Sequence, residues 1–422
     1  MPTPSAARLH AIFASLTVAL FVVAIWLPLL GFFLGWPPPW LNENRVRQPL
    51  PDLEATRASI VSYPGRFAAA FGDRFGFRDH LIRWNNAVTL LWLHDSMTMQ
   101  GGASGVDFWQ AEGGQPRRIV NGGGEWFFHF TPIMMADQRG LPPADASAVD
   151  AWARELERRR AWLAERGIAY RFVIAPEKQS IYPEHLPAGV PVRGTGTDAV
   201  VERLRQTTSV EVVDLRQPLR DAKTQGRTYH RTDTHWNALG AFVAYRAIAT
   251  SLVPVLPALA PLTPSDVEVT ERRMLAGRFL ETLGIADLAL EDAVLVTPKR
   301  PAHAREIKGG GDVLPLVAGR RLGKFRTGRP GLPTAVVVHD SFMEANLHRF
   351  LSEHFARVTY VRHFPAQIIA REQPDVVIEE AAERHLLERP TTAQLPKTGL
   401  TRTRPDGGAR PRQKTPRRPH GR

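Results

Sequence analysis

The chain of 422 residues contains no cysteine. This absence excludes a disulfide framework, zinc–thiolate sites, iron–sulfur clusters and a thiol nucleophile. It leaves the redox compartment open, because a large domain can be secreted without disulfides. The glycine clusters lack the spacing of phosphate-binding and dinucleotide-binding loops, and no interleaved aromatic and basic residues indicate nucleic-acid recognition. We therefore expect no cofactor and no nucleic-acid partner.

The composition is that of a folded protein with one unusual end. Hydrophobic residues make up 43% of the chain, which excludes a wholly disordered or fibrous protein. The formal net charge is +12, but residues 397–422 alone contain nine Lys or Arg and one Asp. This segment has almost no large apolar side chains, so it cannot bury enough surface to offset its ordering entropy. We predict that residues 391–422 form a disordered basic tail, which solubilises the protein or touches an anionic lipid or polysaccharide.

The N-terminal residues indicate attachment to a membrane. Residues 11–35 carry no charge, and at about 1.5 Å per residue a helix of this length crosses a hydrocarbon layer of roughly 30 Å. Tryptophans cluster toward its distal end, where interfacial aromatic residues are common. A cleavable signal peptide is the alternative, but its apolar core is usually shorter and ends in small residues, whereas this one runs into Phe32 and Phe33. We predict an uncleaved membrane anchor at residues 1–36.

The rest of the chain divides into two regions. Residues 37–145 show no clean alternation of strands and helices, although residues 63–93 have a helical pattern, and we expect them to form a linker and accessory region on the body. In residues 146–390, β-branched runs alternate with amphipathic helices, which is typical of a parallel sheet with helices on both faces. We expect strands at residues 168–175, 210–215, 334–338, 358–361 and 375–378. We expect helices from Ser147, at 236–252, at 342–354, near Ala366 and at 379–387.

Ser341 lies where an open α/β sheet places its reactive groups, beyond the carboxyl end of a strand. It follows the strand expected at residues 334–338 and precedes a helix. The free backbone N–H groups and the positive end of that helix would face any oxyanion formed beside the serine hydroxyl. A serine before a helix is most often only an N-cap, so this position alone does not establish a nucleophile.

Asp233 and His235 lie in a second loop, just ahead of the helix expected at residues 236–252. Residues i and i+2 of an extended segment project to the same face, so Asp233 can accept a hydrogen bond from one ring nitrogen of His235. That bond fixes the tautomer and leaves the other nitrogen to take a proton from a hydroxyl group. A lone Asp-x-His pair is as often structural or capping as it is catalytic. Two loops at one sheet edge, however, would supply both a nucleophile and an oriented base.

Four segments together carry a resemblance to a known family. They are Arg74-Phe75-Gly76-Phe77-Arg78, residues 174–183 (IAPEKQSIYP), Thr232-Asp233-Thr234-His235-Trp236-Asn237, and Asp340-Ser341-Phe342 followed by residues 355–361 (FARVTYV). In order and spacing they resemble the alginate O-acetyltransferase family, with its AlgX/AlgJ-type SGNH hydrolase-like domain, over about residues 40 to 390. The resemblance implies an SGNH-hydrolase-like fold and an extracytoplasmic enzyme that moves acetyl groups onto an exopolysaccharide. At the matching positions it implies Ser341 as nucleophile, His235 as general base and Asp233 as the carboxylate that orients the base.

The sequence also departs from the family pattern. Two residues before Ser341, where the family commonly has a small residue, this chain has His339. A bulky ring there would crowd the turn, add a second proton carrier or mark an inactive relative. The absence of a following carbohydrate-binding module makes the chain look like the anchored, single-domain members. The resemblance further implies a role in alginate biosynthesis, an inner-membrane protein with its catalytic domain in the periplasm, and a multipass membrane acyltransferase as acetyl donor.

The expected mechanism has two steps. Ser341, deprotonated by His235, attacks an acetyl carbonyl, and a sugar hydroxyl then takes the acyl group. The backbone N–H of Ser341 or Phe342, together with a side-chain amide such as that of Asn237, is expected to hold the oxyanion. Three residues are expected to contact substrate: Asn237 through its amide, Trp236 by stacking on a sugar ring, and Lys178 by meeting an acidic uronate. A core tryptophan and a solvated lysine are the alternative interpretations of the last two.

Other sites and functions stay open. A second His-Asp-Ser triplet at residues 94–96 ends an apolar stretch with no strand before it, which argues against a catalytic role. His230, Asp233 and His235 are an alternative metal site, but no further ligand is evident, and we expect no metal. The alternative functions are an SGNH-type carbohydrate esterase or deacetylase, with water as the acceptor, and a non-catalytic polysaccharide-binding scaffold.

Overall fold

The computed structural model describes part of the chain. The described residues are 4–36, 48–88, 90, 107–112, 115–122, 125–138, 140, 147–186, 190, 196–275, 277–307 and 323–396. Most of the predicted basic tail, from residue 397 onward, lies outside them, as does the His-Asp-Ser triplet at residues 94–96.

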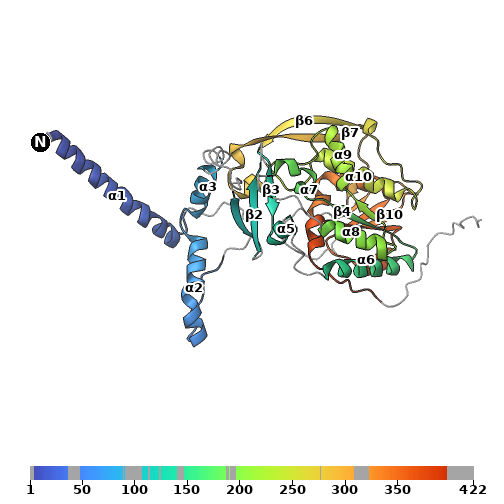
Figure 1. The fold of residues 1–422 in the computed structure, drawn as a ribbon, viewed down its shortest axis with the longest axis horizontal. Coiled ribbons are helices and arrows are strands. Elements are labelled where there is room, and N and C mark those ends of the chain that lie inside the picture. Colours follow the sequence, from blue (N-terminus) through green and yellow to red (C-terminus); the bar gives the residue numbers. More distant parts are fainter. Residues whose placement is uncertain are drawn as a thin grey trace, which may run out of the picture.

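A seven-stranded sheet forms the centre of the body (Figure 1). Its order is β5 (Val212–Asp214), β4 (Ala169–Ala175), β12 (Val376–Ala382), β10 (Thr334–Val338), β11 (Arg357–Val361), β9 (Lys324–Arg326) and β8 (Arg305–Glu306). The first five strands are parallel, whereas β9 and β8 each pair antiparallel with their neighbour. The five strands expected from the sequence are thus the parallel core of this sheet.

Helices cover both faces of the sheet, as predicted. On one face α6 (Ala148–Ala164), α8 (Gly196–Thr207) and α13 (Ala366–Glu372) share a hydrophobic cluster with Val336 and Val338 of β10. On the other face α10 (Ala238–Leu252) and α12 (His348–Leu351) share a cluster with Ala335 and Val337 of the same strand. Successive side chains of a strand point to opposite faces, so the apolar residues of β10 contribute to the hydrophobic clusters on both faces of the sheet.

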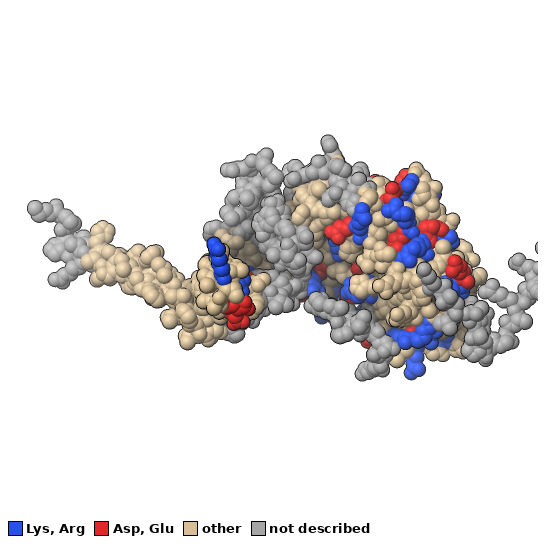
Figure 2. All heavy atoms as spheres, turned by 90° about the horizontal axis from the view of Figure 1, so that it is seen from below, with Lys and Arg blue, Asp and Glu red and all other residues tan. Residues whose placement is uncertain are grey.

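The N-terminal region is built from three helices. The first, α1 (Pro4–Leu34), contains the one span in the described residues that is long and apolar enough to cross a membrane, His10–Leu34. Figure 2 shows it as a projecting rod whose described side chains are neither acidic nor basic. The helical pattern predicted at residues 63–93 is divided into α2 (Arg57–Arg74) and α3 (Arg78–Val88). The break falls at Phe77, which has a left-handed φ of 65°.

Two small antiparallel sheets flank the body. One consists of β1 (Asp107–Glu112), β2 (Gln115–Asn121) and β3 (Phe127–Phe130), and the other of β6 (Val267–Leu275) and β7 (Leu290–Pro298). Phe128 and Phe130 of β3 lie in the same hydrophobic cluster as α10, so this part of the accessory region shares a core with the body. The other helices used below are α5 (Pro132–Gln138), α7 (Lys178–Ile181), α9 (Arg216–Asp221) and α11 (Arg278–Thr282).

Two of the predicted helices are wrong in part. Residues 379–387 do not form a helix, because β12 continues to Ala382 and a 3₁₀ turn, Glu383–Leu387, follows it. The cause is a pair of buried acidic residues: Glu379 accepts a hydrogen bond from Tyr170 Oη at 2.6 Å, and Glu380 accepts one from the Asp340 N–H at 2.9 Å. The helix expected at residues 342–354 is interrupted by a π-helical turn, Met343–Leu347, with Asn346 at a φ of 69°.

Because the central strands are buried between two hydrophobic clusters, shortening one of their side chains should strongly lower the stability of the fold. Ile378 of β12 is fully buried, so Ile378→Ala should lower the free energy of unfolding by about 2–5 kcal/mol through lost burial and a residual cavity. Val269→Ala on β6, where the side chain is 51% exposed, should change it by no more than about 0.5 kcal/mol. Urea unfolding of the detergent-solubilised chain measures both, and equal effects would contradict this view of the core.

Candidate active site

Asp233, His235 and Ser341 form a continuous hydrogen-bonded series. His235 Nδ1 lies 2.7 Å from Asp233 Oδ1, and His235 Nε2 lies 2.8 Å from Ser341 Oγ. Because a carboxylate only accepts hydrogen bonds, Nδ1 carries the ring proton in the neutral tautomer and Nε2 accepts the serine hydroxyl proton. The structure therefore brings together two segments that are 106 residues apart in the sequence.

The loop that carries His235 has a different geometry from the extended segment expected. An isolated antiparallel bridge between Tyr229 and Trp236 closes it into a tight turn ahead of α10. The preceding strand of the central sheet, β5, is separated from it by α9 and a 3₁₀ turn. Asp233 Oδ1 also accepts the backbone N–H of His235 at 3.1 Å. Asp233 thus reaches the imidazole through a local side-chain turn, of the kind Asp forms with the residue two positions ahead.

Two buried residues outside this loop hold it in place. The Glu291 carboxylate of β7 accepts the backbone N–H groups of Arg231 at 2.6 Å and Thr232 at 3.1 Å, and the Thr232 hydroxyl as well. The Lys178 ammonium of α7 donates to the carbonyl oxygens of His230 at 2.8 Å, Arg231 at 3.0 Å and, on β3, Phe127 at 2.6 Å. Glu291 could not be singled out from the sequence, because nothing in its local pattern distinguishes it from other acidic residues on amphipathic strands.

Hydrogen bonds and neighbouring charges keep the carboxyl groups of Asp233 and Glu291 ionised. Burial on its own would raise the pKa of Asp233, but the charge of His235 and its hydrogen bonds outweigh burial and hold that pKa well below the usual range. The same competition lowers the pKa of Glu291 to about 2, since burial is outweighed by hydrogen bonds from His230 and Thr232. Asp233 is therefore a permanent negative charge beside the imidazole.

A second pair of carboxyl groups fixes the turn that carries Ser341. Asp340 Oδ1 accepts the backbone N–H of Phe342 at 2.8 Å, and Asp340 Oδ2 accepts the N–H of Ala382 at the end of β12 at 2.7 Å. Glu380 of β12 in turn accepts the Asp340 N–H. The N–H of Phe342, one of two expected oxyanion donors, is thus already bonded, whereas the Ser341 N–H has no acceptor within the described residues.

The Asp340–Glu380 pair shares one negative charge. Burial, reinforced by the neighbouring Asp340 carboxylate, raises the pKa of Glu380 well above its usual value. Burial also acts to raise the pKa of Asp340, but the hydrogen bond from Glu380 and the charges of Arg384 and His385 lower it overall. Two buried carboxyl groups in contact cannot both ionise at low cost, so Glu380 keeps its proton and Asp340 is the anion.

The three residues expected to bind substrate lie in the interior instead. Lys178, 1% exposed, is saturated by the three carbonyl groups described above. Trp236 is fully buried and donates through Nε1 to the carbonyl of Ala345 at 3.0 Å, inside the π-helical turn. Asn237 is fully buried and caps α10 through its side-chain oxygen, which accepts the N–H groups of Leu239 and Gly240. All three are buried and hydrogen-bond to backbone groups of the segments around the site.

His339 fits into the turn without crowding it. Its Nδ1 donates to the carbonyl of Asp340 at 2.7 Å, and its ring packs edge-on against Tyr360 with centroids 5.8 Å apart. Burial lowers the pKa of His339 to about 4, so its imidazole is neutral at physiological pH. His230, an element of the alternative metal site, turns its ring toward Glu291, with Nδ1 3.5 Å from Oε1. Among the described residues no group of three or more ligating side chains could hold a metal ion.

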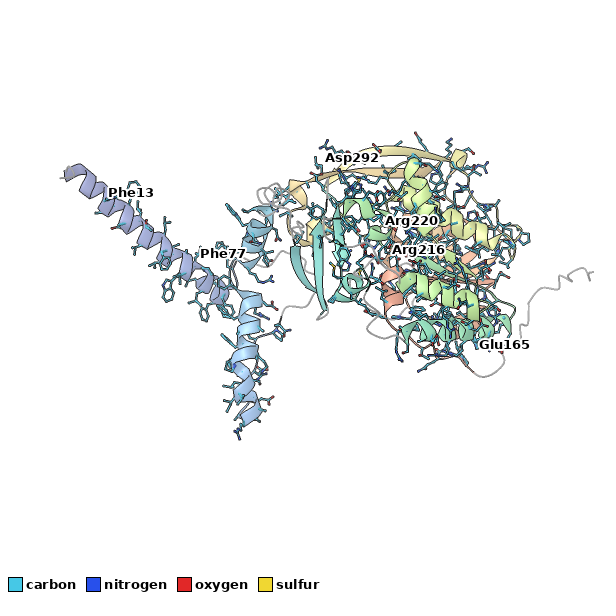
Figure 3. All side chains as sticks on the ribbon, viewed as in Figure 1. Phe13, Phe77, Glu165, Arg216, Arg220 and Asp292 are labelled. Atoms are coloured by element: carbon cyan, nitrogen blue, oxygen red, sulfur yellow. The ribbon has the colours of Figure 1, made fainter. Side chains whose placement is uncertain are left out.

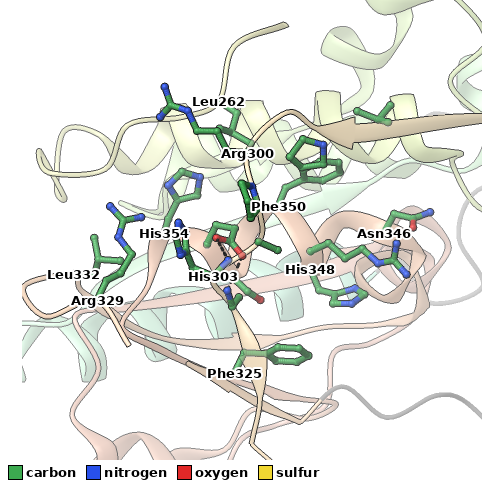
Figure 4. A pocket seen from close by; sticks show the side chains of 18 of the residues that line it. Leu262, Arg300, His303, Phe325, Arg329, Leu332, Asn346, His348, Phe350 and His354 are labelled. Carbon is green, nitrogen blue, oxygen red and sulfur yellow. Dashed lines mark hydrogen bonds between the residues drawn. The ribbon is translucent and has the colours of Figure 1, made fainter. Parts of the chain in front are cut away.

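A groove of about 970 Å³ opens beside the helix that follows Ser341 (Figure 4). It is lined by residues from Glu344 and Asn346 along α12 to His354, and by the segment around Arg300 and His303. Arg300, Arg329 and Arg349 line it, and none of them has an ion-pair partner in the described part of the chain. Glu306, Glu344 and Glu353 line it as well, so the groove presents both basic and acidic side chains.

The family resemblance is confirmed by comparison with known proteins. Residues 119–311 match the family model of an SGNH hydrolase-like domain, acetyltransferase AlgX. This segment contains Asp233 and His235 and ends before Ser341, so it is shorter than the range of residues 40–390 expected from the motifs. The match also confirms the predicted fold class, an SGNH-like α/β domain, here preceded by one apolar N-terminal helix.

Curated relatives match about a third of the chain. A protein of Azotobacter vinelandii named "Probable alginate O-acetylase AlgJ" is 29% identical over 143 residues, which is 32% of this chain and 34% of the relative. Its namesake in Pseudomonas aeruginosa is 30% identical over 141 residues, 32% of this chain and 33% of the relative. The chain thus matches about a third of the length of these relatives.

Two solved structures are similar over a longer stretch. The O-acetyltransferase domain of Pseudomonas putida AlgJ is 20% identical with a TM-score of 0.42, covering 64% of this chain and 92% of that one. Pseudomonas aeruginosa AlgX is 19% identical with a TM-score of 0.41, covering 64% and 63%.

The Asp340–Glu380 pair predicts a pH-dependent stability. Above about pH 4.3 the unfolded chain releases the Glu380 proton that the folded chain retains, so wild-type stability falls as pH rises toward the folded-state pKa. Glu380→Gln mimics the protonated carboxyl and removes this titration. Its melting temperature should match that of the wild type near about pH 4 and exceed it at neutral pH. Glu306→Gln, at an exposed position of β8, is the matched control.

Thermal unfolding of the three proteins across this pH range isolates the contribution of Glu380, because the other carboxyl groups are common to all of them. A difference between Glu380→Gln and the wild type that is the same at every pH would show that Glu380 is ionised in the folded chain.

Proposed function

We propose that the chain is a membrane-anchored O-acetyltransferase that transfers acetyl groups to hydroxyl groups of an exopolysaccharide through an acyl-enzyme on Ser341. The observation that carries the proposal is the unbroken hydrogen-bonded series from Asp233 through His235 to Ser341. A hydroxyl, an imidazole and a buried carboxylate in this order are the groups that acyl transfer by a serine nucleophile requires. The match of residues 119–311 to an acetyltransferase domain supports the same chemistry.

In the first step the acetyl group passes to the enzyme. His235 Nε2 takes the Ser341 hydroxyl proton as Oγ forms a bond to the acetyl carbonyl carbon, and the carbonyl oxygen becomes an oxyanion. The Ser341 N–H, at the start of the helix, is placed to donate to that oxyanion. The bond to the donor's leaving group then breaks, and the leaving group takes the proton from His235. Asp233 stabilises the imidazolium while it exists.

In the second step a sugar hydroxyl replaces the leaving group. It gives its proton to His235 Nε2 as its oxygen attacks the acyl-enzyme, and the tetrahedral intermediate collapses to the sugar ester. Ser341 Oγ recovers the proton, so the enzyme returns to its starting state. We assign the groove that contains Arg300, Arg329 and Arg349 to the acceptor chain, whose acidic groups can pair with these arginines.

The acceptor and the location follow from the relatives and from α1. Because the curated relatives are named as alginate O-acetylases, we propose an alginate-like acidic exopolysaccharide as the acceptor. The helix α1 fits a single-pass membrane anchor. We propose that it holds the protein in the inner membrane, with the catalytic body in the periplasm and a multipass membrane acyltransferase as the acetyl donor.

Removal of the nucleophile should abolish transfer. Ser341→Ala is expected to lower the rate by about three to six orders of magnitude, as for a triad serine, and Asp233→Asn by about four orders through loss of the correct tautomer. Ser209→Ala, an exposed serine, is the control and should keep wild-type activity. Mass spectrometry of an oligouronate incubated with the full chain and an activated acetyl ester measures the transfer.

The same assay separates transfer from hydrolysis. Acetylated sugar as the main product supports the proposal, whereas acetate alone would indicate an esterase. Near-normal transfer by Ser341→Ala, or failure of a serine-reactive phosphonate to label the wild type at Ser341, would contradict the assignment of the nucleophile.

A further inference from the structure

The segment Arg74-Phe75-Gly76-Phe77-Arg78, which has no part in the catalytic scheme, forms an elbow against the end of α1. The backbones meet at Gly76, where an added Cβ would lie 2.4 Å from the carbonyl oxygen of Pro28 and 2.8 Å from the Cα of Gly31. Only a residue without a side chain permits this approach. Figure 3 places Phe77 at this junction, between α1 and the body.

Aromatic rings lock α1 to the elbow. Phe32 of α1 packs against Phe71 of α2 with centroids 4.8 Å apart, and Trp36 packs edge-on against Phe77 at 5.1 Å. The elbow is in turn joined to the body, because Arg83 of α3 forms an ion pair with Asp287 at 2.7 Å. The buried Asn86 of α3 also donates to the carbonyl of Leu283 at 2.9 Å. The anchor, the elbow and the body are thus linked by direct contacts.

The face of α2 that contacts α1 continues beyond the contact as an aromatic stripe. From Phe71 the rings of Phe67 and Tyr63 follow at centroid distances of 6.1 and 6.0 Å. Ile60, one turn before Tyr63 and two turns before Phe67, extends the same face, since residues three, four and seven apart are aligned on a helix. Ile60 is 56% exposed and Phe67 is 39% exposed. In Figure 1, α2 leads away from the end of α1, so the stripe loses its protein partner as the two helices diverge.

One flank of the stripe is polar. Ser59, Ser62 and Arg66 lie there, about 80–140° around the helix from Phe67, and Arg66 donates to the Ser59 hydroxyl at 3.0 Å. The helix carries three arginines and one aspartate, a charge that suits anionic lipid headgroups. A helix with an aromatic face flanked by basic and polar side chains is typical of one that lies in a membrane interface.

We propose that the aromatic stripe of α2, formed by Ile60, Tyr63, Phe67 and Phe71, rests on the surface of the lipid bilayer that α1 crosses. The stripe begins at the very end of the apolar span, on the side of α2 that faces α1, and a bilayer around α1 covers that side. The elbow then holds the catalytic body at a fixed height and orientation over the membrane. This inference rests on the anchoring role of α1 in the proposed function, but not on the chemistry at Ser341.

The absence of cysteine makes a direct test possible, because one introduced cysteine is the sole labelling site. The full chain is spin-labelled at Ile60→Cys or Phe67→Cys on the stripe and reconstituted in phosphatidylethanolamine–phosphatidylglycerol vesicles. Ala69→Cys is the matched control, two residues from Phe67 on the opposite face of the exposed helix. Val269→Cys reports on the body, and Leu20→Cys reports on α1. Electron paramagnetic resonance measures collision with lipid-soluble oxygen and with a water-soluble nickel chelate.

We expect the oxygen-to-nickel collision ratio to be several-fold higher at residues 60 and 67 than at residues 69 and 269. Equal ratios at residues 67 and 69, with residue 20 in lipid, would overturn the inference and leave the anchor intact. A residue 20 exposed to the nickel chelate would instead contradict the anchor itself. Protection at residue 67 that appears only at high protein density, with spin–spin broadening, would show that a second copy covers the stripe and would also overturn it.

Discussion

The hydrogen bond between His235 Nε2 and Ser341 Oγ is the contact on which the proposed chemistry depends. Its two partners come from a loop and a turn that are remote in the sequence, and a displacement of about 1 Å would break it. Each side is therefore fixed independently of the other. Glu291 and Lys178 hold the imidazole loop by its backbone, and Asp340 ties the serine turn to the end of β12. Trp236 links the two sides directly, because its indole N–H donates a hydrogen bond to the π-helical turn that follows the serine.

These supports consist of charged groups that are costly to bury. An unpaired carboxylate or ammonium in a protein interior loses several kcal/mol of hydration, so each must recover hydrogen bonds in full. Lys178 does so with three carbonyl groups, and Glu291 does so with two backbone N–H groups and a hydroxyl. Such networks contribute little net stability, but they admit one arrangement only. Precise placement, which acyl transfer needs, is what they provide.

The sequence predicted the parts of the molecule that depend on apolar periodicity. The valine run that ends at Val338 had to be a central parallel strand, because no other element buries both faces of so short a segment. The position of Ser341 beyond it follows from that topology. Its meeting with His235 does not, because α9 and a 3₁₀ turn separate the His235 loop from β5. The prediction failed where polar residues are buried. Glu379 and Glu380 resembled the acidic first turn of a helix, and Lys178 and Asn237 resembled ligands for a sugar. Only the fold reveals the partners that draw these side chains inside, as it reveals Glu291.

The position of β12 in the centre of the sheet also constrains when the site comes into being. It pairs with both β4 and β10, and Tyr170 and Glu379, bonded across the first of these pairs, are 209 residues apart in the chain. Contacts between residues so far apart in the sequence form late in folding, because the entropy cost of closing the long loop must be met before the contacts can stabilise the chain. During synthesis β12 leaves the ribosome after every other strand of the central sheet. A nascent chain that lacks β12 therefore carries a serine whose proposed surroundings are not yet in place, and the candidate site forms only once this strand has been made.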